Sequence, residues 1–283
     1  SYQLSEQISS NWDNSFHAVT TDYNHDGFGD LLLPTTEYYD GRMSVMQLFD
    51  YSFHWQSTIS SQSDIGVIKA FDINQDGFED AIYADGKVLK IVNIEDQSLI
   101  AQYSFESNIT DFVIYENTVI VARKDTVSVL TLNTYSLSEQ SFINQRCQYL
   151  TLLNKDTDLQ QELICIEGDH YENISNIYTY EIDNLVLVEK SKKAFDRSIY
   201  GIAIDESTRN NQGYFVTVQK GQGYAGESDV SYHIEKHDAN SNVVWRSPGL
   251  IGKPSEQGLK ARYSSSNGTQ LMLSTQKAMY MIN

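Results

Sequence analysis

One nine-residue pattern occurs twice in this chain, over residues 22–30 and again over residues 72–80. Both copies place an oxygen-bearing side chain at positions 1, 3, 5 and 9, and a glycine at position 6. Ca²⁺ takes about six to eight oxygen ligands, and alternate residues of a tight loop can supply them. Gly27 and Gly77 permit a turn that a β-carbon would resist. The pattern therefore predicts two calcium-binding loops, and it constrains the fold more than any other feature.

The expected ligands are four side chains and the backbone carbonyl of position 7 in each loop. They are Asp22, Asn24, Asp26, Phe28 and Asp30 in the first loop, and Asp72, Asn74, Asp76, Phe78 and Asp80 in the second. An EF-hand loop needs a glutamate at position 12 and a helix on each side. Here position 12 is Leu33 or Tyr83, and strand-like segments flank both loops. Each loop therefore closes within nine residues and joins two β-strands.

A third, eroded copy of the pattern covers residues 154–162. Its candidate ligands are Asn154, Asp156, Asp158, Gln160 and Glu162. Leu159 replaces the glycine of position 6, so a tight turn is not assured and calcium binding stays open at this stage. The segment Asp205-Glu206-Ser207 resembles the start of a fourth copy, but it lacks the remaining positions and is assigned no metal.

Charge and hydropathy exclude several classes of partner. The 283 residues carry a formal net charge of −18, which disfavours contact with nucleic acid or anionic lipid. The sequence contains no apolar run of the length that a membrane-spanning helix needs, about 18 residues. We therefore expect no nucleic-acid partner and no insertion into a membrane. The sequence does not predict an oligomeric state.

The two cysteines, Cys147 and Cys165, flank the third loop on segments expected to be neighbouring antiparallel strands. A cross-strand disulfide and two buried thiols are both compatible with this placement. The calcium loops favour an extracellular, cell-surface or periplasmic location, because millimolar calcium there fills weak sites.

Alternating apolar and polar segments separated by Asp, Asn and Ser recur along the chain, and this pattern is typical of strands and hairpins. Repeats of about 40 to 50 residues indicate propellers or solenoids. The sequence Leu-Ser-Glu-Gln occurs at residues 4–7 and again at 137–140, and residues 278–282 resemble a strand without a partner. An N-terminal segment that pairs with this last strand would close a ring and remove its open edge.

We therefore expect one all-β domain over residues 1–283, a β-propeller closed by its N- and C-terminal strands. The expected blades are residues 14–62, 63–107, 108–146, 147–196, 197–250, and 251–283 completed by 1–13. Seven blades are the alternative, if the long region 197–250 contains an additional one. Both calcium loops should join the first and second strands of their blades on the same face.

The two loops and their flanking strands resemble the FG-GAP and VCBS repeats of calcium-binding propellers, such as those of integrin α-subunits. The resemblance is specific over residues 22–30 and 72–80, partial over residues 148–166, and architectural elsewhere. It implies that calcium braces the blades, and that ligands bind on a face of the disc or in the central channel. It also implies that the loop positions named above are the calcium ligands.

Two functions remain open. The first is a non-catalytic recognition or adhesion module that binds a glycan or a protein on a propeller face. The second is a secreted polysaccharide lyase or glycoside hydrolase built on a propeller. We find no nucleophile elbow, phosphate-binding loop or spaced His/Cys metal pair, and we assign no catalytic residue. A lyase would need basic or tyrosine side chains converging at the channel, and only 20 Lys and Arg residues are present, without an evident cluster.

Overall fold

The computed structural model describes most of the chain between Val19 and Ile282, and the regular elements of this part are β-strands. The described residues are 19–21, 30–37, 40–47, 53–58, 65–94, 96, 98–133, 135–156, 158, 160–169, 174–208, 211–221, 230–264, 268–275 and 279–282. None of them belongs to a helix with the length and apolarity needed to cross a membrane.

The described strands form six antiparallel sheets, each built from consecutive strands of the chain. The first sheet contains β1 (Val19–Thr21), β2 (Asp30–Glu37), β3 (Asp40–Gln47) and β4 (Phe53–Thr58). The second contains β5 (Ile65–Phe71), β6 (Asp80–Asp85), β7 (Val88–Asn93) and β8 (Leu99–Ser104). The third contains β9 (Ile109–Tyr115), β10 (Thr118–Arg123), β11 (Val127–Asn133) and β12 (Ser136–Ile143).

The remaining three sheets continue the series. The fourth contains β13 (Tyr149–Leu153), β14 (Glu162–Asp169), β15 (Ile174–Asp183) and β16 (Val186–Phe195). The fifth contains β17 (Ile199–Ile204), β18 (Tyr214–Lys220), β19 (Ser231–His237) and β20 (Val243–Arg246). The sixth has three described strands, β21 (Pro254–Ser264), β22 (Gly268–Thr275) and β23 (Met279–Ile282).

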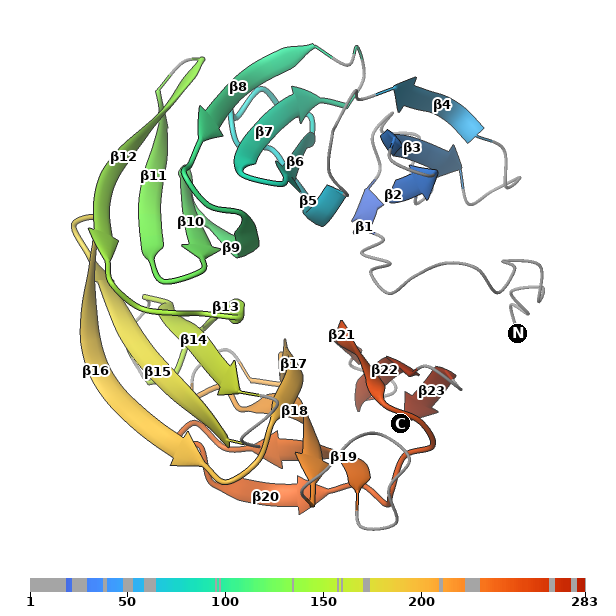
Figure 1. Cartoon of the computed structure of the whole chain (residues 1–283), viewed down its shortest axis with the longest axis vertical. Helices are drawn as coiled ribbons and strands as arrows, with labels where there is room; N and C mark the ends of the chain where they lie inside the picture. Colours follow the sequence, from blue (N-terminus) through green and yellow to red (C-terminus); the bar gives the residue numbers. More distant parts are fainter. Residues whose placement is uncertain are drawn as a thin grey trace.

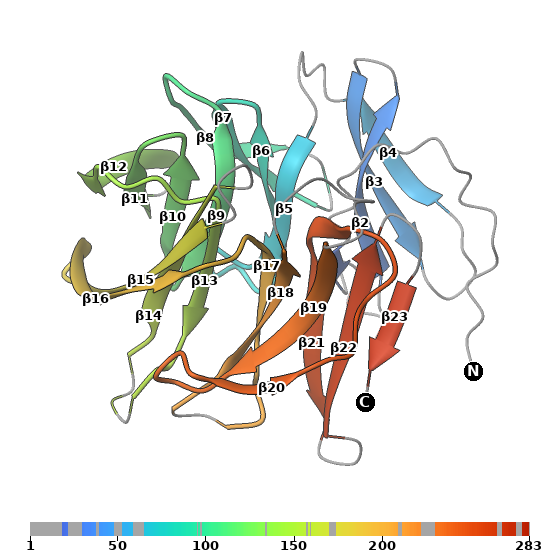
Figure 2. The same cartoon turned by 60° about the horizontal axis from the view of Figure 1, so that its bottom comes forward.

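The sheets follow one another around a central axis, with the first strand of each sheet innermost and the fourth outermost (Figure 1). Neighbouring inner strands contact each other in sequence, from β1 with β5 through to β17 with β21. Figure 2 shows the same sheets tilted like the blades of a fan. The expected all-β propeller is therefore confirmed. Its blade count and its closure by residues 1–13 stay predictions, because residues 1–18 lie outside the described part.

Apolar side chains hold the disc together between consecutive sheets. One buried cluster joins the second and third sheets around Ile91 and Phe112, and another joins the third and fourth around Val129 and Leu163. The middle strand β11 is buried along almost its whole length, because sheets on both sides cover its two faces. In the outer strand β12, by contrast, most positions are exposed or half-buried. Each sheet therefore depends on its neighbours for its core.

The two cysteines form a disulfide. Cys147 lies just before β13 and Cys165 lies in the adjacent strand β14, with their Cα atoms 5.4 Å apart. The structure thus selects the bonded alternative that the sequence left open. The bond ties the start of the fourth sheet to its second strand, at the junction with the third sheet.

Candidate cation-binding loops

Three loops connect the first and second strands of their sheets in the same register. The residue at position 9 of each pattern begins the second strand and pairs with the last residue of the first strand. The pairs are Thr21 with Asp30, Phe71 with Asp80, and Leu153 with Glu162. In all three sheets, the segment between these two strands therefore starts and ends at corresponding positions of the ladder.

The loop 72–80 turns its oxygen-bearing side chains toward its own backbone. The backbone N–H of Asp76 donates to Asn74 Oδ1 at 2.9 Å and to Asp72 Oδ1 at 3.1 Å. The N–H of Gly77 donates to Asp72 Oδ2 at 3.0 Å, and the N–H of Phe78 donates to Asp76 Oδ1 at 2.9 Å. These bonds gather the carboxylates and the amide oxygen of positions 1, 3 and 5 on the inside of the turn.

Gly77 is required by this geometry. Its φ of +94° lies in the left-handed region that side chains with a β-carbon rarely adopt, although no neighbouring atom would obstruct a β-carbon there. The sequence-based reason for a glycine at position 6 is thus supported for this loop. Gln75, two residues earlier, also has a positive φ of 60°, which completes the tight reversal.

Asp80 is the residue of this loop that most indicates a missing partner. Its side chain is 0% exposed, and neither carboxylate oxygen accepts a hydrogen bond. Burial, together with the charges of Asp76 and Asp72, raises the pKa of Asp80 to about 7. The nearby backbone N–H groups of Ile73 and Asn74 offset only part of this increase. A buried carboxylate without a partner is costly, and a cation is the partner that would satisfy both oxygens.

The third loop brings its acidic side chains together more tightly. Among the described residues, only Asp156, Asp158 and Glu162 place three carboxylate groups within 4.8 Å of one another. Glu162 is buried, and this burial raises its pKa. Its Oε2 accepts the backbone N–H of Lys155 at 2.7 Å. The eroded copy therefore retains an acidic cluster, and Leu159 at position 6 lies outside the described residues.

The two amide residues of the third loop take other roles. Asn154 donates from Nδ2 to the carbonyl of Asp158 at 3.0 Å, and its backbone N–H donates to Gln212 Oε1 at 2.9 Å. Gln160 is exposed, and its backbone N–H donates to Asp158 Oδ1 at 2.9 Å. Asn154 therefore fastens the loop to itself and to the neighbouring sheet.

In the fourth, truncated copy, the first carboxylate pairs with an ammonium group of the protein itself. Asp205 directly follows β17 and lies 2.6 Å from Lys236 Nζ, while Thr269 Oγ1 donates to it at 2.9 Å. Burial of Asp205 raises its pKa, but the hydrogen bonds from Lys236, Ser207 and Thr269 outweigh this effect and lower the pKa overall. This aspartate is therefore compensated by protein groups, in contrast to Asp80.

Most of the first loop lies outside the described part of the chain. Asp22, Asn24, Asp26 and Phe28 lie outside the described residues, and Asp30 is described only as the first backbone position of β2. In the second loop, Asp72, Asn74, Asp76, Phe78 and Asp80 all fall within one turn. The carboxylates of Asp72, Asp76 and Asp80 do not all lie within 4.8 Å of one another, so they are more widely spaced than those of the third loop.

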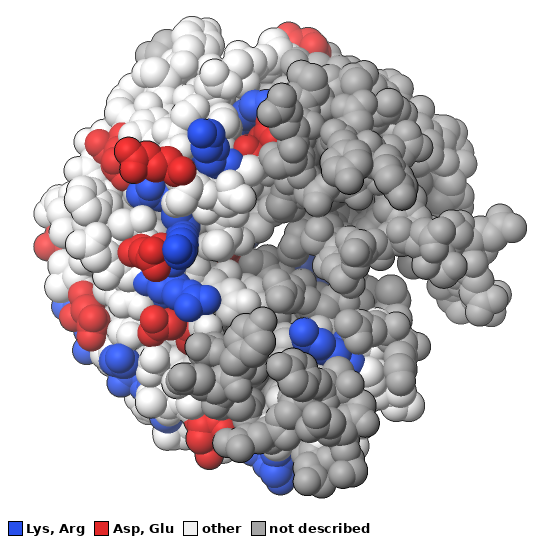
Figure 3. All heavy atoms as spheres, viewed as in Figure 1, with Lys and Arg blue, Asp and Glu red and all other residues white. Residues whose placement is uncertain are grey.

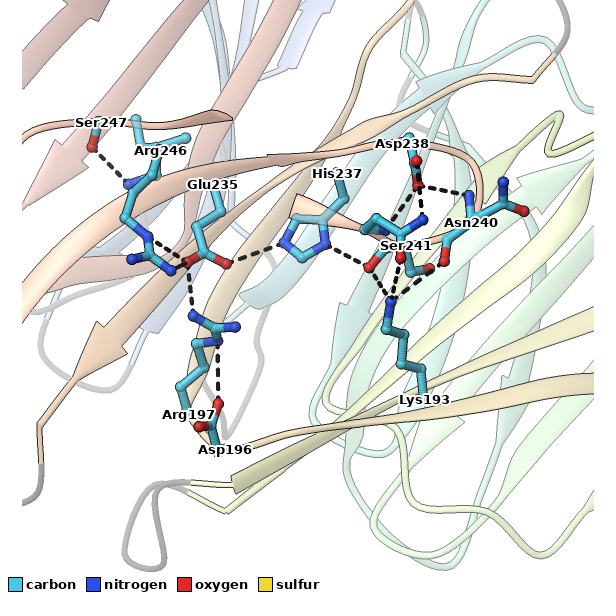
Figure 4. A network of polar contacts seen from close by, with 12 residues as sticks. Lys193, Asp196, Arg197, Glu235, His237, Asp238, Asn240, Ser241, Arg246 and Ser247 are labelled. Atoms are coloured by element: carbon cyan, nitrogen blue, oxygen red, sulfur yellow. Dashed lines mark hydrogen bonds and ion pairs between the residues drawn. The ribbon is translucent and has the colours of Figure 1, made fainter. Parts of the chain in front are cut away.

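A buried charge network in the fifth sheet was not expected from the sequence (Figure 4). Glu235 on β19 is 0% exposed and faces Arg197 Nη1 at 2.8 Å, Arg246 Nη2 at 2.6 Å and His237 Nε2 at 3.2 Å. These partners, with desolvation opposing them, hold the pKa of Glu235 below its usual range. Lys193 on β16 reaches the carbonyl oxygens of Asn240 and Ser241, so the network also joins the fourth and fifth sheets. Both oxygens of the Glu235 carboxylate are thus paired within the protein, which indicates a structural role.

The inner strands surround a cavity of 220 Å³ in the channel. Its charged lining residues are Lys69 on β5, Asp111 on β9, Lys260 on β21 and Glu206 just after β17. Tyr149 on β13 also lines it. Because these residues come from five different sheets, no local sequence pattern could have brought them together.

Comparison with known proteins identifies the fold and no family. No family model matches the sequence, and no curated protein matches it. The chain is similar in structure to a Dos1 propeller, with a TM-score of 0.65 and 9% identity over 96% of this chain and 70% of that one. It is similar to hydrazine synthase of Kuenenia stuttgartiensis, with a TM-score of 0.72 and 9% identity over 100% and 80% of the two chains. It is also similar to BBS1N from a complex with ARL6DN, with a TM-score of 0.61 and 10% identity over 95% and 92%.

Proposed function

We propose that this protein is a calcium-stabilised β-propeller that recognises a glycan or a protein at the cell surface without catalysing a reaction. The observation that carries the calcium part is Asp80, whose carboxylate is buried in its loop without a hydrogen-bonding partner. The expected ligand positions of residues 72–80 offer three carboxylates, one amide oxygen and a backbone carbonyl. These are the hard oxygen ligands that Ca²⁺ prefers. The acidic cluster of residues 156–162 is a candidate for a third ion.

Calcium in such a loop would act as a brace. The five oxygen groups nearly complete the coordination shell, so little of the ion would remain open to polarise a substrate. The ion would instead fix the connection between β5 and β6 and compensate the clustered negative charge. A rigid scaffold of this kind suits recognition, in which contacts are made by loops on a face of the disc.

The finer architecture belongs to the same proposal. We infer six blades in a closed ring, with residues 1–13 supplying a fourth strand to the sixth sheet. Two observations support this inference. The sixth sheet has three described strands where the other five have four. The Leu-Ser-Glu-Gln sequence of residues 4–7 recurs at residues 137–140, within β12, the outermost strand of the third sheet. An extracellular or periplasmic location is in keeping with the disulfide, since such bonds persist in oxidising compartments.

Calorimetric titration of the chelator-treated protein with CaCl₂ tests the calcium part. We expect binding to the wild-type protein, and the loss of one ion in Asp76→Asn, which weakens position 5 of the second loop. Asp125→Asn is the matched control, because Asp125 is an exposed turn residue between β10 and β11. Equal stoichiometry in Asp76→Asn and the wild-type protein would contradict calcium binding by this loop.

A glycan array probed with the intact protein in calcium tests the recognition part. We expect reproducible binding of one glycan class and no turnover of that glycan. The Asp80→Asn variant, studied where it remains folded, separates the two roles of calcium. Retained ligand binding supports a brace, whereas lost binding with an unchanged melting temperature would place calcium in the ligand site.

The enzymatic alternative is favoured by one observation. The channel brings together Lys69, Lys260 and Tyr149, and convergent basic and tyrosine groups are what a lyase acting on acidic sugars would need. Incubation with acidic polysaccharides, followed by absorbance of the unsaturated products and a reducing-end assay, tests this candidate. Product formation that is lost in Tyr149→Phe would replace the recognition proposal with a lyase or hydrolase.

A further inference from the structure

We propose that the central channel holds a binding site for a small anion, with Lys69 and Lys260 as its two positively charged ligands. The anions in question are a carboxylate, such as that of an acidic sugar, or an inorganic oxyanion, which share negatively charged oxygen acceptors. The inference goes beyond the calcium proposal and does not depend on it, because none of the lining residues belongs to residues 72–80 or 154–162.

The site is built by the innermost strands of five sheets. Lys69 lies on β5 and Lys260 on β21, so the two ammonium groups approach the cavity from the second and the sixth sheets. Between them, β9, β13 and β17 contribute Asp111, Thr151 and Ile202, among others. Figure 3 shows that the face seen there is hollowed near its centre. The positions of the two lysines are therefore set by rigid strands.

In the cavity, the charge of Lys260 meets a second positive charge, that of Lys69, and the negative charge of Asp111. The side chain of Lys260 is exposed to the channel, yet protein atoms surround it on most sides. This desolvation lowers its pKa, and the charge of Lys69 lowers it further, while Asp111 acts in the opposite direction. Lys69 itself lies 5.8 Å from the centre of the Phe112 ring, a contact that stabilises a cation without neutralising it. An anion between the two ammonium groups would remove their mutual repulsion.

The acidic residues of the lining fill this role only in part, since the pKa of Lys260 stays lowered despite Asp111. Asp111 is buried and already accepts two backbone N–H groups, from Phe112 at 2.8 Å and from Leu150 at 2.7 Å. Its charge is thereby used to fasten the third sheet to the fourth. Glu206 is exposed in the cavity lining and would repel an anion. Its replacement therefore provides a second test of the site.

The size of the cavity limits the ligand. Its 220 Å³ falls below the range of about 300–1,000 Å³ that is typical of pockets for drug-sized molecules. A monosaccharide, a short organic acid or an inorganic oxyanion is therefore a better match than a chain of several sugars lying wholly inside.

Calorimetry with three probes tests the proposal and distinguishes the two sources of anion. The intact protein is titrated with sulfate, with galacturonate and with galactose, which resembles galacturonate but lacks its carboxylate. We expect sulfate or galacturonate to bind, and galactose to bind at least roughly tenfold more weakly than galacturonate, because charge-assisted hydrogen bonds are about twice as strong as neutral ones. Sulfate alone would identify an inorganic oxyanion site, and galacturonate alone a sugar-acid site.

The variants assign the binding to the two lysines. Lys69→Met and Lys260→Met keep the apolar stems and should each weaken anion binding by roughly tenfold or more. Lys124→Met, in the exposed turn between β10 and β11, is the matched control and should bind as the wild-type protein does. Glu206→Gln removes a negative charge from the lining and should strengthen binding severalfold.

One further measurement, proton uptake on binding, keeps the test decisive if a lysine variant fails to fold. Sulfate does not titrate near neutral pH, so binding beside Lys260 should draw a proton from buffer at pH values near the lowered pKa of that lysine. Titrations in buffers with different ionisation enthalpies measure this uptake. The proposal is overturned if neither anion binds, if uncharged galactose binds as tightly as the anion that binds, or if Glu206→Gln weakens anion binding.

Discussion

Replacement of Asp80 by asparagine should have opposite effects on stability with and without calcium. In the calcium-free protein, burial and the charges of Asp76 and Asp72 raise the pKa of Asp80 from 3.8 to about 7. The folded state then binds a proton more tightly than the unfolded state. The favourable contribution of protonated Asp80 is fully present below about pH 4, and it is lost as the pH rises through about 7.

The magnitude follows from the size of the pKa difference. A shift of one unit corresponds to about 1.4 kcal/mol, so the raised pKa of Asp80 lowers the stability of the calcium-free protein, relative to its value at low pH, by about 4 kcal/mol at pH 8 and by about 2 kcal/mol at pH 5. The asparagine variant removes the charge but leaves a buried amide, which costs about 1–3 kcal/mol where it lacks partners. We therefore expect a net gain of about 1–3 kcal/mol in chelator at pH 8.

Calcium should reverse the order of stability of the wild-type protein and the Asp80→Asn variant. A bound ion compensates the carboxylate, and it stabilises the wild-type protein by about 2.7 kcal/mol when its free concentration is 100 times the dissociation constant. The variant loses one charged ligand and most of this gain. In saturating calcium the wild-type protein should thus be the more stable of the two.

Urea denaturation of both proteins at pH 5 and pH 8, in chelator and in calcium, measures these differences. The difference between variant and wild type in chelator should grow by about 2–3 kcal/mol from pH 5 to pH 8, since only the wild-type protein ionises Asp80 in this interval. Asp125→Asn controls for the loss of an exposed carboxylate. The reasoning is refuted if the wild-type protein is more stable than Asp80→Asn in chelator at pH 8, or if calcium stabilises both equally.

Three other changes have definite expected outcomes. Replacing Cys147 and Cys165 by serine should cost about 3 kcal/mol, because the loop they close spans 18 residues; equal urea midpoints would contradict this. Glu235→Gln should cost about 3 kcal/mol, at the low end for a broken buried pair since both guanidinium groups reach solvent. Its control, Glu181→Gln, disrupts an exposed pair with Lys190 and should change stability by less than about 1 kcal/mol in the same assay. Deleting residues 1–10 should lower the melting temperature of the whole protein, and an unchanged melting temperature would argue against ring closure by this segment.

The sequence predicts the local features of this molecule well. The alternation of apolar and polar residues marks the strands, and β5 to β8 all lie within the expected segment 63–107. The glycine at position 6 and the inward-turned side-chain oxygens of residues 72–80 follow from the chemistry of one short turn. The burial of Asp80 could not be read in this way, because it depends on how the second sheet packs against its neighbours.

Features that depend on the arrangement of several sheets could not be predicted from the sequence. Lys69 and Lys260 are far apart in the chain, and only the circular arrangement brings them to one cavity. The sequence suggested no basic cluster for the same reason. Glu235 and its partner Arg197 likewise come from β19 and the segment before β17, so their pairing is decided by the register of the fifth sheet.

The ammonium group of Lys236 beside Asp205 has a consequence for the response of the disc to its surroundings. A metal ion leaves its loop when its concentration falls, whereas Lys236 is covalently part of the chain and stays within 2.6 Å of its carboxylate. If the loop 72–80 depends on an exchangeable ion, the fifth sheet has a permanent substitute for it. Depletion of calcium should then loosen the protein on one side, around the second sheet, while the opposite side in Figure 1 keeps its shape. Amide hydrogen exchange, compared sheet by sheet with and without chelator, should then become faster in the second sheet and stay unchanged in the fifth.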